Sequence, residues 1–409
     1  MKRLLISLSM LAAGQAALAQ PWRFTKIVDT DTPVPSDVGT FNIGGAFQSV
    51  SVYADRVAFR GRSKLGRVGV YEWRGGVGRA IADQDTMVPR GSGVFENFRD
   101  VNVTSRGSTF FGVGGGNSGL FYNDGNTLGH VADRMDDIPD GGGKFTGVTN
   151  AHHSVGTSSV FGGFNSSAAQ PFGIYRSDDG VLSRIADKTM SPPGHAELFS
   201  AMLSWHLDGT ATIFTAETAS GYRALMRSVN GQITTLVDTE QTWTDGNRFN
   251  YIGHMRTSAG STVFRAYTDD IAERLYKISD EGIGLLVDEN MPPPDGSSPT
   301  YGGFVDFAYA NDTLVFEAGN GAMYTDFGGS MSRVIGPGDS LDGKKILNLT
   351  FYEHGFDGTT AAFWVVFEGD SSFFSNRAIY TVTIPAPGAA GFALISALAL
   401  SASPRRRAR

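Results

Sequence analysis

The chain has 409 residues, of which 53 are glycine, 11% are aromatic and only 18% are charged, and this composition favours many short strands joined by tight turns over long helices. The absence of cysteine excludes disulfides, a lipid-bearing cysteine and thiolate metal sites. The net charge of −7 falls to −13 without the six basic residues of the two end segments, and so acidic a body argues against nucleic acid as a partner.

The N-terminal segment reads as an export signal. Two basic residues, Lys2 and Arg3, precede an apolar run, and Ala17-Leu18-Ala19 follows it. This order of charged, apolar and small residues is typical of a cleavable signal peptide. We predict a signal over residues 1–19 that is recognised through Ala17 and Ala19. The alternative, an amphipathic first helix, is disfavoured because Pro21 and strand-like sequence follow at once.

Residues 20–384 contain a sevenfold repeat with a period of about fifty residues, marked by three short motifs. The first motif is an apolar run that ends in phenylalanine: Val57-Ala58-Phe59, Thr109-Phe110-Phe111, Ser159-Val160-Phe161, Thr212-Ile213-Phe214, Thr262-Val263-Phe264, Leu314-Val315-Phe316 and Val365-Val366-Phe367. The second motif follows eight to fourteen residues later and usually ends in an aromatic residue, as in Gly69-Val70-Tyr71 and Ala378-Ile379-Tyr380.

The third motif is an apolar pair before aspartate, and its distribution indicates how the fold closes. It occurs as Ile81-Ala82-Asp83 and in the next four repeats, and is degenerate in the sixth. The seventh repeat lacks it, but Ile27-Val28-Asp29 stands ahead of the first repeat. Four short strands at this period predict a seven-bladed β-propeller, an all-β fold, whose last blade is closed by the N-terminal strand. Stacked sandwich domains or a β-helix fit these repeats less well.

The repeats resemble a family of exported bacterial proteins with a degenerate tandem Asn-x-x-Gly-x-x-Ala-Phe motif and assorted C-terminal anchors. Val57-Ala58-Phe59 matches the end of that motif, Gly209 to Phe214 keeps its glycine, and most copies lack the asparagine. The resemblance implies a propeller-like exported protein and no particular activity.

Acidic residues follow the fourth strand of most repeats, where we expect them to gather on one face of the propeller. Hard oxygen ligands on loops suit Ca²⁺, and the weak candidates for such a site are Asp83, Asp85, Asp133 and Asp136. No copy has the spacing of a dedicated calcium loop. We therefore expect each aspartate to accept hydrogen bonds from its own turn, with no cofactor required.

Histidines recur near the first strand of several repeats: His152, His153, His206, His254 and His354. First strands line the channel of a propeller, so a metal-binding cluster on the axis is conceivable. No acidic partner occurs at matching positions, and we expect ordinary half-buried polar roles instead.

The C-terminal segment resembles the PEP-CTERM sorting signal that an exosortase-type transpeptidase recognises. Pro385 and Pro387 precede a short apolar stretch, and Arg405, Arg406 and Arg407 follow it. Ala386 replaces the central glutamate of the family motif. A helix over the apolar stretch would be a marginal membrane anchor. We therefore expect residues 385–409 to anchor the protein transiently, or as a plain anchor if they are not processed.

These features predict an exported, non-catalytic surface or extracellular-matrix protein of the cell envelope. Its expected partners are the export machinery, an exosortase-like enzyme and an extracellular polysaccharide or surface protein. No Gly-x-Ser-x-Gly or His-Glu-x-x-His motif is present. The alternative is an exported polysaccharide hydrolase or lyase with its site on the loop face, because propellers host both uses.

Overall fold

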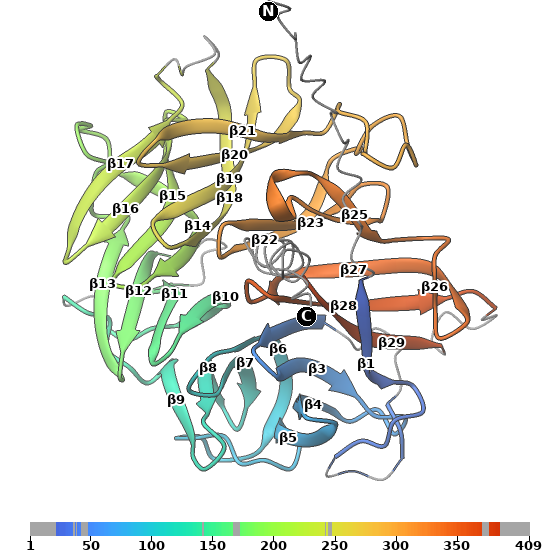
Figure 1. The fold of residues 1–409 in the computed structure, drawn as a ribbon. Coiled ribbons are helices and arrows are strands. Elements are labelled where there is room, and N and C mark those ends of the chain that lie inside the picture. Colours follow the sequence, from blue (N-terminus) through green and yellow to red (C-terminus); the bar gives the residue numbers. More distant parts are fainter. Residues whose placement is uncertain are drawn as a thin grey trace, which may run out of the picture.

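Seven β-sheets are arranged around one axis in the computed structural model (Figure 1). The structure describes residues 22–35, 37, 39–41, 48–140, 143–166, 172–241, 243, 248–369 and 376–384. The predicted signal with Ala17 and Ala19, and the predicted tail with its prolines and arginines, lie outside these residues. We name the four strands of a blade A to D from the axis outward.

The A strands form the ring that surrounds the axis, because each contacts the A strands of both neighbouring blades. They are β2 (Gln48–Tyr53), β6 (Phe95–Val103), β10 (Gly147–Val155), β14 (Phe199–Asp208), β18 (Phe249–Ser258), β22 (Phe304–Ala310) and β27 (Lys344–Phe356). The B strands are β3 (Arg56–Arg62), β7 (Ser108–Gly114), β11 (Ser158–Phe164), β15 (Ala211–Thr218), β19 (Ser261–Thr268), β23 (Thr313–Ala318) and β28 (Thr360–Phe367).

The outer half of each blade consists of a C and a D strand, paired antiparallel. The C strands are β4 (Val68–Arg74), β8 (Asn117–Asn123), β12 (Gly173–Asp178), β16 (Arg223–Val229), β20 (Glu273–Ser279), β24 (Met323–Thr325) and β29 (Arg377–Thr383). The first six D strands are β5 (Val77–Asp83), β9 (Leu128–Asp133), β13 (Val181–Asp187), β17 (Gln232–Asp238), β21 (Gly282–Asp288) and β25 (Ser332–Ile335). A 3₁₀ turn, η1 (Phe327–Gly329), precedes β25.

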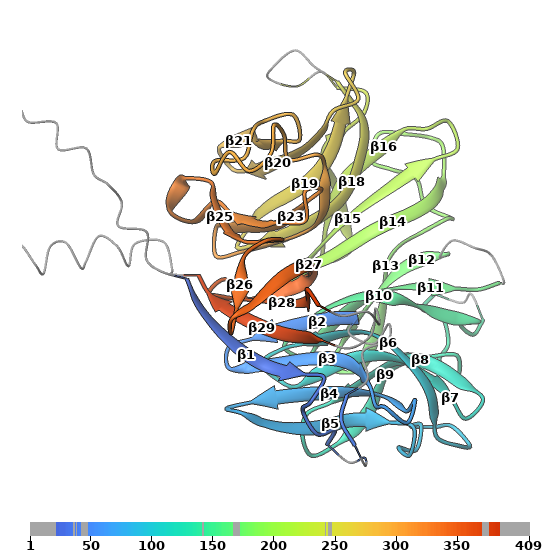
Figure 2. The same ribbon diagram turned by 90° about the vertical axis from the view of Figure 1, so that its right-hand side faces the viewer.

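The N-terminal strand closes the seventh blade, as the displaced third motif predicts. Strand β1 (Arg23–Asp29) pairs antiparallel with β29, from Arg23 opposite Thr383 to Asp29 opposite Ala378. Figure 2 shows β1 beside β29 at the edge of this blade, and the short strand β26 (Ser340–Leu341) adds to its other edge. Because β1 covers the edge of β29, no C strand is left as an open sheet edge in this blade.

The first two motifs meet directly in every blade, at one fully buried position. The phenylalanine of the B strand lies opposite the aromatic or methionine side chain of the C strand, as in Phe59 opposite Tyr71. Two predicted positions are wrong: the repeated phenylalanine is Phe110 in the second blade and Phe363 in the seventh, where we expected Phe111 and Phe367. Both neighbourhoods are rich in phenylalanine, and strand register, which the local sequence does not fix, decides which residue faces the C strand.

A third aromatic side chain enters each of several blade cores from the preceding D–A loop or from the first residue of the A strand. Phe41 meets Tyr71 edge to face with ring centroids 5.1 Å apart, and Phe95 meets Phe121 in the same way at 5.1 Å. Phe145 and Tyr175 repeat the contact at 4.9 Å. Such pairs add about 0.5–1.5 kcal/mol beyond the burial of their area, so these loops also stabilise the next blade.

Candidate binding site on the propeller axis

The side chains around the axis occupy equivalent places in the A strands. In each of six blades, one A-strand residue pairs with the B-strand residue that precedes the buried phenylalanine. These axial residues are Ser51, Asn102, His153, His206, Arg256 and Ala308. A bulge in β27 breaks the register in the seventh blade, which contributes Glu353 and His354.

On one side of the ring, neutral side chains join consecutive blades. Ser51 Oγ accepts a hydrogen bond from the backbone amide of Val103 at 2.9 Å, and Asn102 Oδ1 accepts one from Ser154 at 3.0 Å. His153 Nδ1 accepts the third, from Leu207 at 3.0 Å. Each acceptor therefore holds the A strand of the next blade by one backbone amide. We call these three bonds the neutral seam.

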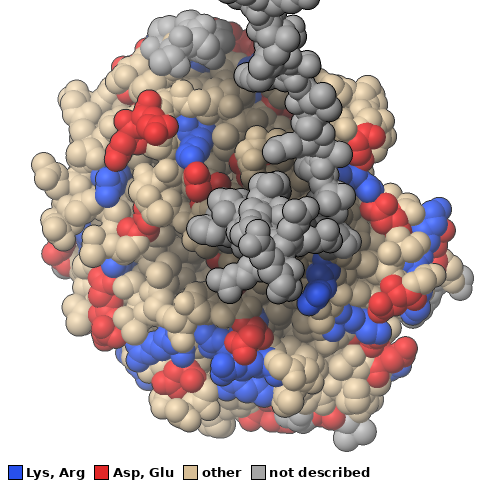
Figure 3. Space-filling model, viewed as in Figure 1, with Lys and Arg blue, Asp and Glu red and all other residues tan. Residues whose placement is uncertain are grey.

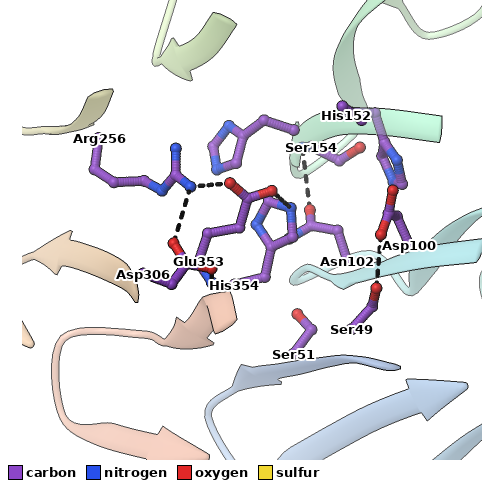
Figure 4. A network of polar contacts seen from close by, with 12 residues as sticks. Ser49, Ser51, Asp100, Asn102, His152, Ser154, Arg256, Asp306, Glu353 and His354 are labelled. Carbon is purple, nitrogen blue, oxygen red and sulfur yellow. Dashed lines mark hydrogen bonds and ion pairs between the residues drawn. The ribbon is translucent and has the colours of Figure 1, made fainter. Parts of the chain in front are cut away.

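On the other side, charged residues join the fifth, sixth and seventh blades (Figure 4). The Arg256 guanidinium forms a short ion pair with Glu353 and lies 3.7 Å from Asp306, whose Oδ2 accepts a hydrogen bond from the Glu353 amide. Burial lowers the pKa of Arg256 to about 10, so it stays charged at neutral pH, and burial raises the pKa of Asp306. We call Arg256, Asp306 and Glu353 the charged seam.

Three imidazole rings are packed between the two seams. His153 stacks on His206 with ring centroids 3.4 Å apart, and His354 stacks on the same residue, His153, at 5.7 Å. Desolvation lowers the pKa of all three histidines well below the usual value, and the charge of Arg256 acts in the same direction. The stack is therefore neutral at pH 7, which leaves His153 Nδ1 free to accept the amide of Leu207.

The stacked histidines separate two cavities on the axis. The larger, which we call the mouth cavity, has a volume of about 400 Å³ and is lined by the A–B turns of all seven blades. The smaller, the inner cavity, has a volume of about 130 Å³ and lies against Ser204, Trp205 and His254. His153, His206, Arg256, Glu353 and His354 line both, so this layer forms the wall between them.

The carboxylates of the mouth cavity already have protein partners. Asp208 accepts hydrogen bonds from Thr257 and from the Gly260 amide, and Asp357 accepts the Ala54 amide of the first blade at 2.7 Å. Glu353 is paired with Arg256. Acids held in this way join blades, and none of the three described here is placed as a free general acid or base.

The six aspartates of the third motif accept hydrogen bonds from their own turns, as expected. Asp83 Oδ1, for example, accepts the Asp85 amide at 3.0 Å and the Thr86 hydroxyl at 2.9 Å. The same contact to the amide two residues later occurs at Asp29, Asp133, Asp187, Asp238 and Asp288.

Arginines lie beside all four calcium candidates. Arg67 pairs with Asp85 and also acts on Asp83, while Arg90 Nη1 lies 2.6 Å from Asp136 Oδ1 and 3.5 Å from Asp133 Oδ2. Within the described ranges, His130, Asp133 and Asp136 are the one group of three whose ligating atoms lie within 4.8 Å of one another. Arg90 Nη1 is also 2.6 Å from His130 Nε2, so a guanidinium lies where a cation would be held. That these aspartates serve as turn residues without calcium stays a prediction.

The visible molecular surface carries acidic and basic side chains side by side (Figure 3). Several of the aspartates that we expected to gather on one face are paired with a neighbouring base, including Asp29 with Lys26 and Asp187 with Arg184. Among the described residues, no helix has the length and apolar character needed to cross a membrane.

Sequence reasoning located the axial histidines but missed their charged partners. Asp306 and Glu353 precede Phe316 and Phe363 by the same number of residues as His254 precedes Phe264. The match for Glu353 is hidden when Phe367 is taken as the repeated phenylalanine of the seventh blade. Arg256 lies two residues after His254 in the same blade. The signal that was available is the repeat itself: Arg256 precedes Phe264 by the same number of residues as His206 precedes Phe214 and His153 precedes Phe161.

Fold and site together define a seven-bladed β-propeller with a polar channel blocked by a layer of histidines. No known protein family matches the chain by sequence, and no curated protein matches it. One solved structure, of a prolyl endopeptidase, supports the propeller fold: it is 12% identical with a TM-score of 0.50, over 83% of this chain and 48% of that one. YCF48 from Cyanidioschyzon merolae is 14% identical, over 88% and 98% of the two chains, with a TM-score of 0.42. A structure of YCF48 with a bound D1 peptide is 12% identical, over 90% and 97%, also at 0.42.

Proposed function

We propose that this chain is an exported, non-catalytic β-propeller that binds the end of an extracellular polysaccharide in its mouth cavity. The observation that carries this proposal is the cavity of about 400 Å³ to which all seven blades contribute turns. Its volume lies in the range of small-ligand sites, so it suits one end of a polymer better than an uninterrupted length of it.

The lining of the mouth cavity supports a sugar as the ligand. Tyr53 stands at its rim with 41% of its surface exposed, held beside the Arg56 guanidinium at 5.7 Å, and offers an apolar ring face with a hydroxyl. Ser105, Ser258 and Asn311 add neutral hydrogen-bonding groups from three other blades. A flat aromatic face with neutral polar groups around it matches the alternating apolar and hydroxyl surfaces of a sugar ring.

Binding without turnover is the better-supported mode. The three carboxylates at this cavity hold neighbouring blades or Arg256, as described above. Cleavage of a glycosidic bond by the usual route needs two carboxyl groups free to act on the substrate. The hydrolase or lyase alternative gains no support from this geometry.

Delivery to the cell surface completes the proposal and rests on the sequence alone. The export machinery would remove residues 1–19 after Ala19. An exosortase-like enzyme would then act at Pro385 and Pro387 while the short apolar segment, with Arg405, Arg406 and Arg407, holds the chain at the membrane. The propeller would thereby reach the envelope or the surrounding matrix.

A glycan array probed with the full chain tests the binding role, with a hydrolysis assay on each bound glycan. Tyr53→Ala should abolish binding, and no glycan should be shortened. Tyr122→Ala is the matched control, because Tyr122 also lies beside an arginine, Arg106 at 5.2 Å, but does not line the mouth cavity. Equal loss in both variants, or release of sugar from a bound glycan, would refute the proposal.

A further inference from the structure

Two hydrogen-bond acceptors meet in the wall of the mouth cavity. Glu353 Oε1 lies 3.3 Å from His354 Nε2, and both residues line the cavity (Figure 4). The His354 side chain is only 7% exposed, and its Nε2 has no hydrogen-bond partner in the part of the chain that the structure describes. The Glu353 side chain is 34% exposed, so a ligand in the cavity can reach its carboxylate.

The proton on the His354 ring explains why Nε2 is an acceptor. Burial holds the pKa of His354 well below its usual value, so the ring is neutral at pH 7 and carries one N–H. The ring's hydrogen bond to the His152 backbone acts to raise this pKa, as a bond donated by the ring does, and it therefore uses Nδ1–H. Nε2 is left with a lone pair beside the Glu353 carboxylate, which is ion-paired with Arg256. Two acceptors in this arrangement favour a ligand that donates to both.

The charge of the mouth cavity favours a donor that is positively charged. One arginine, Arg256, lines the cavity against three carboxylates, those of Asp208, Glu353 and Asp357. Arg256 is paired with Glu353, but the partners of Asp208 and Asp357 are hydroxyl groups and backbone amides, which leave both charges uncompensated. Because the histidines are neutral, the described lining has a net formal charge of −2. The cavity therefore attracts a cation and repels an acidic group.

A second hollow, with a volume of about 370 Å³, adjoins the mouth cavity and carries charge of the same sign. Three residues line both hollows: Ser258, Ala259 and Tyr309. The one cation in the described lining of the second hollow, Lys277, forms a short ion pair with Asp312. Asp280 and Glu281 are exposed there and form no ion pair with any described residue. A polymer that leaves the mouth cavity on this side therefore meets further negative charge.

We propose that the mouth cavity takes a terminal sugar that carries a free primary amine, with its ammonium group bonded to Glu353 Oε1 and His354 Nε2. An ammonium group has three N–H donors and no acceptor, so it satisfies both atoms at once, and its bond to a carboxylate is charge-assisted. An N-acetylated sugar offers one uncharged N–H instead, and a uronic acid brings a charge of the wrong sign. This inference rests on the proposed sugar binding and names the class of sugar.

Titration calorimetry of the full chain at pH 6.5 tests the inference with trisaccharides of glucosamine, of N-acetylglucosamine and of a uronic acid. At this pH the amine is protonated, whereas the stacked histidines stay neutral because their pKa values lie well below the usual value. We expect the glucosamine trisaccharide to bind at least tenfold more tightly than its N-acetylated form, and the uronic acid to bind most weakly. Added salt should narrow these differences, because it screens charge. A trilysine peptide that binds as tightly as the amino sugar would overturn the assignment to a sugar.

Nitrogen-15 NMR of the histidine rings reads the proposed contact directly. The signal of His354 Nε2 should shift when the glucosamine trisaccharide binds, because its lone pair then accepts a hydrogen bond. The N-acetylated trisaccharide should shift it less. A His354 Nε2 signal that stays in place with the amino sugar bound would contradict the assignment.

Asp208→Asn removes one negative charge from the cavity and keeps a side-chain oxygen for the Gly260 amide. It should reduce the preference for the amino sugar over the N-acetylated sugar at least threefold. Asp124→Asn is the matched control, because Asp124 accepts the amides of Asn126 and Thr127 in its own turn and lines neither hollow. Equal affinities for the two trisaccharides, or equal effects of the two substitutions, would overturn this inference and leave sugar binding standing. Absent binding of every glycan would overturn both.

Discussion

The two seams of the axial ring both join neighbouring blades, but they do so through different interactions. Across the neutral seam, Ser51, Asn102 and His153 each accept one backbone amide from the next blade. Across the charged seam, the enclosed Arg256 joins Asp306 and Glu353 of the next two blades. A neutral acceptor costs little to bury when it is bonded, whereas an ion must recover its desolvation energy from its partners.

The difference teaches that repeat position fixes where blades are joined but not how. Arg256 and Glu353 of the charged seam line both cavities, and Arg256 is a permanent cation beside the histidine stack. The neutral seam joins the first four blades through uncharged side chains. We therefore expect the loss of one partner in the charged seam to lower the free energy of unfolding strongly. In the neutral seam, the loss of one acceptor should cost about as much as one buried hydrogen bond.

Removal of Trp22 to Asp31 should have the largest effect, because it opens the ring on which both seams depend. Strand β1 covers the edge of β29, Val28 is 1% exposed, and the Trp22 indole donates to the Arg333 carbonyl at 3.2 Å. We expect loss of cooperative thermal unfolding, measured by circular dichroism. An unchanged melting temperature in the truncated protein would contradict this view of closure.

Arg256→Met should lower the free energy of unfolding by about 1–3 kcal/mol, because Glu353 and Asp306, which are only half-buried, would lose the cation that partners them. Replacing all three residues together, as Arg256→Met, Asp306→Asn and Glu353→Gln, should recover much of that loss. Urea unfolding of the single and triple variants measures the difference. A triple variant no more stable than the single one would show that the charged seam acts through packing instead.

Lowering the pH below about 6.5 should destabilise the protein through the stacked histidines. Their folded pKa values lie below the unfolded value of about 6.5, so the unfolded state binds more protons, and stability falls as pH falls, by up to about 1.4 kcal/mol per pH unit for each histidine.

Glu317 acts in the opposite direction, since burial raises its pKa to about 7 and favours the folded state at acid pH. The histidine contribution is therefore read as a difference: the loss of stability between pH 7 and pH 5 should be smaller in His206→Asn than in the unmodified protein. If the free energy of unfolding changes with pH in the same way in both proteins, His206 does not contribute to the pH dependence.

Asn102→Ala tests the neutral seam and should cost about 1–3 kcal/mol, because the Ser154 amide would be left buried without its acceptor. Ser105→Ala is the control, an exposed residue in the following turn. We expect the Asn102 loss to be the same at pH 6 and pH 8, since no ionisation is involved. Thermal unfolding of both variants measures it, and a loss that varies with pH would link the two seams.

Asp83→Ala should have the smallest effect, about 1 kcal/mol, equal in millimolar calcium and in chelator. Asp83 accepts hydrogen bonds within its own turn, and Arg67 lies beside it. A calcium-dependent rise in melting temperature that is lost in Asp83→Ala or Asp133→Ala would instead make this face a metal-binding site.

The sequence by itself determined the number of blades, the order of strands and the closure by β1. The regular repeat indicates the number of blades and their strand order, and the displaced copy of the third motif indicates that the N-terminal strand completes the last blade. It also placed Asp83 and its equivalents in turns, where the bonds are local. Tertiary structure decided the rest: strand register selected Phe110 and Phe363, and the bulge in β27 brought Glu353 and His354 to the axis. Register and bulges arise from pairing between distant strands, so residues such as Arg256, Asp306 and Glu353 become a site only when the ring has closed.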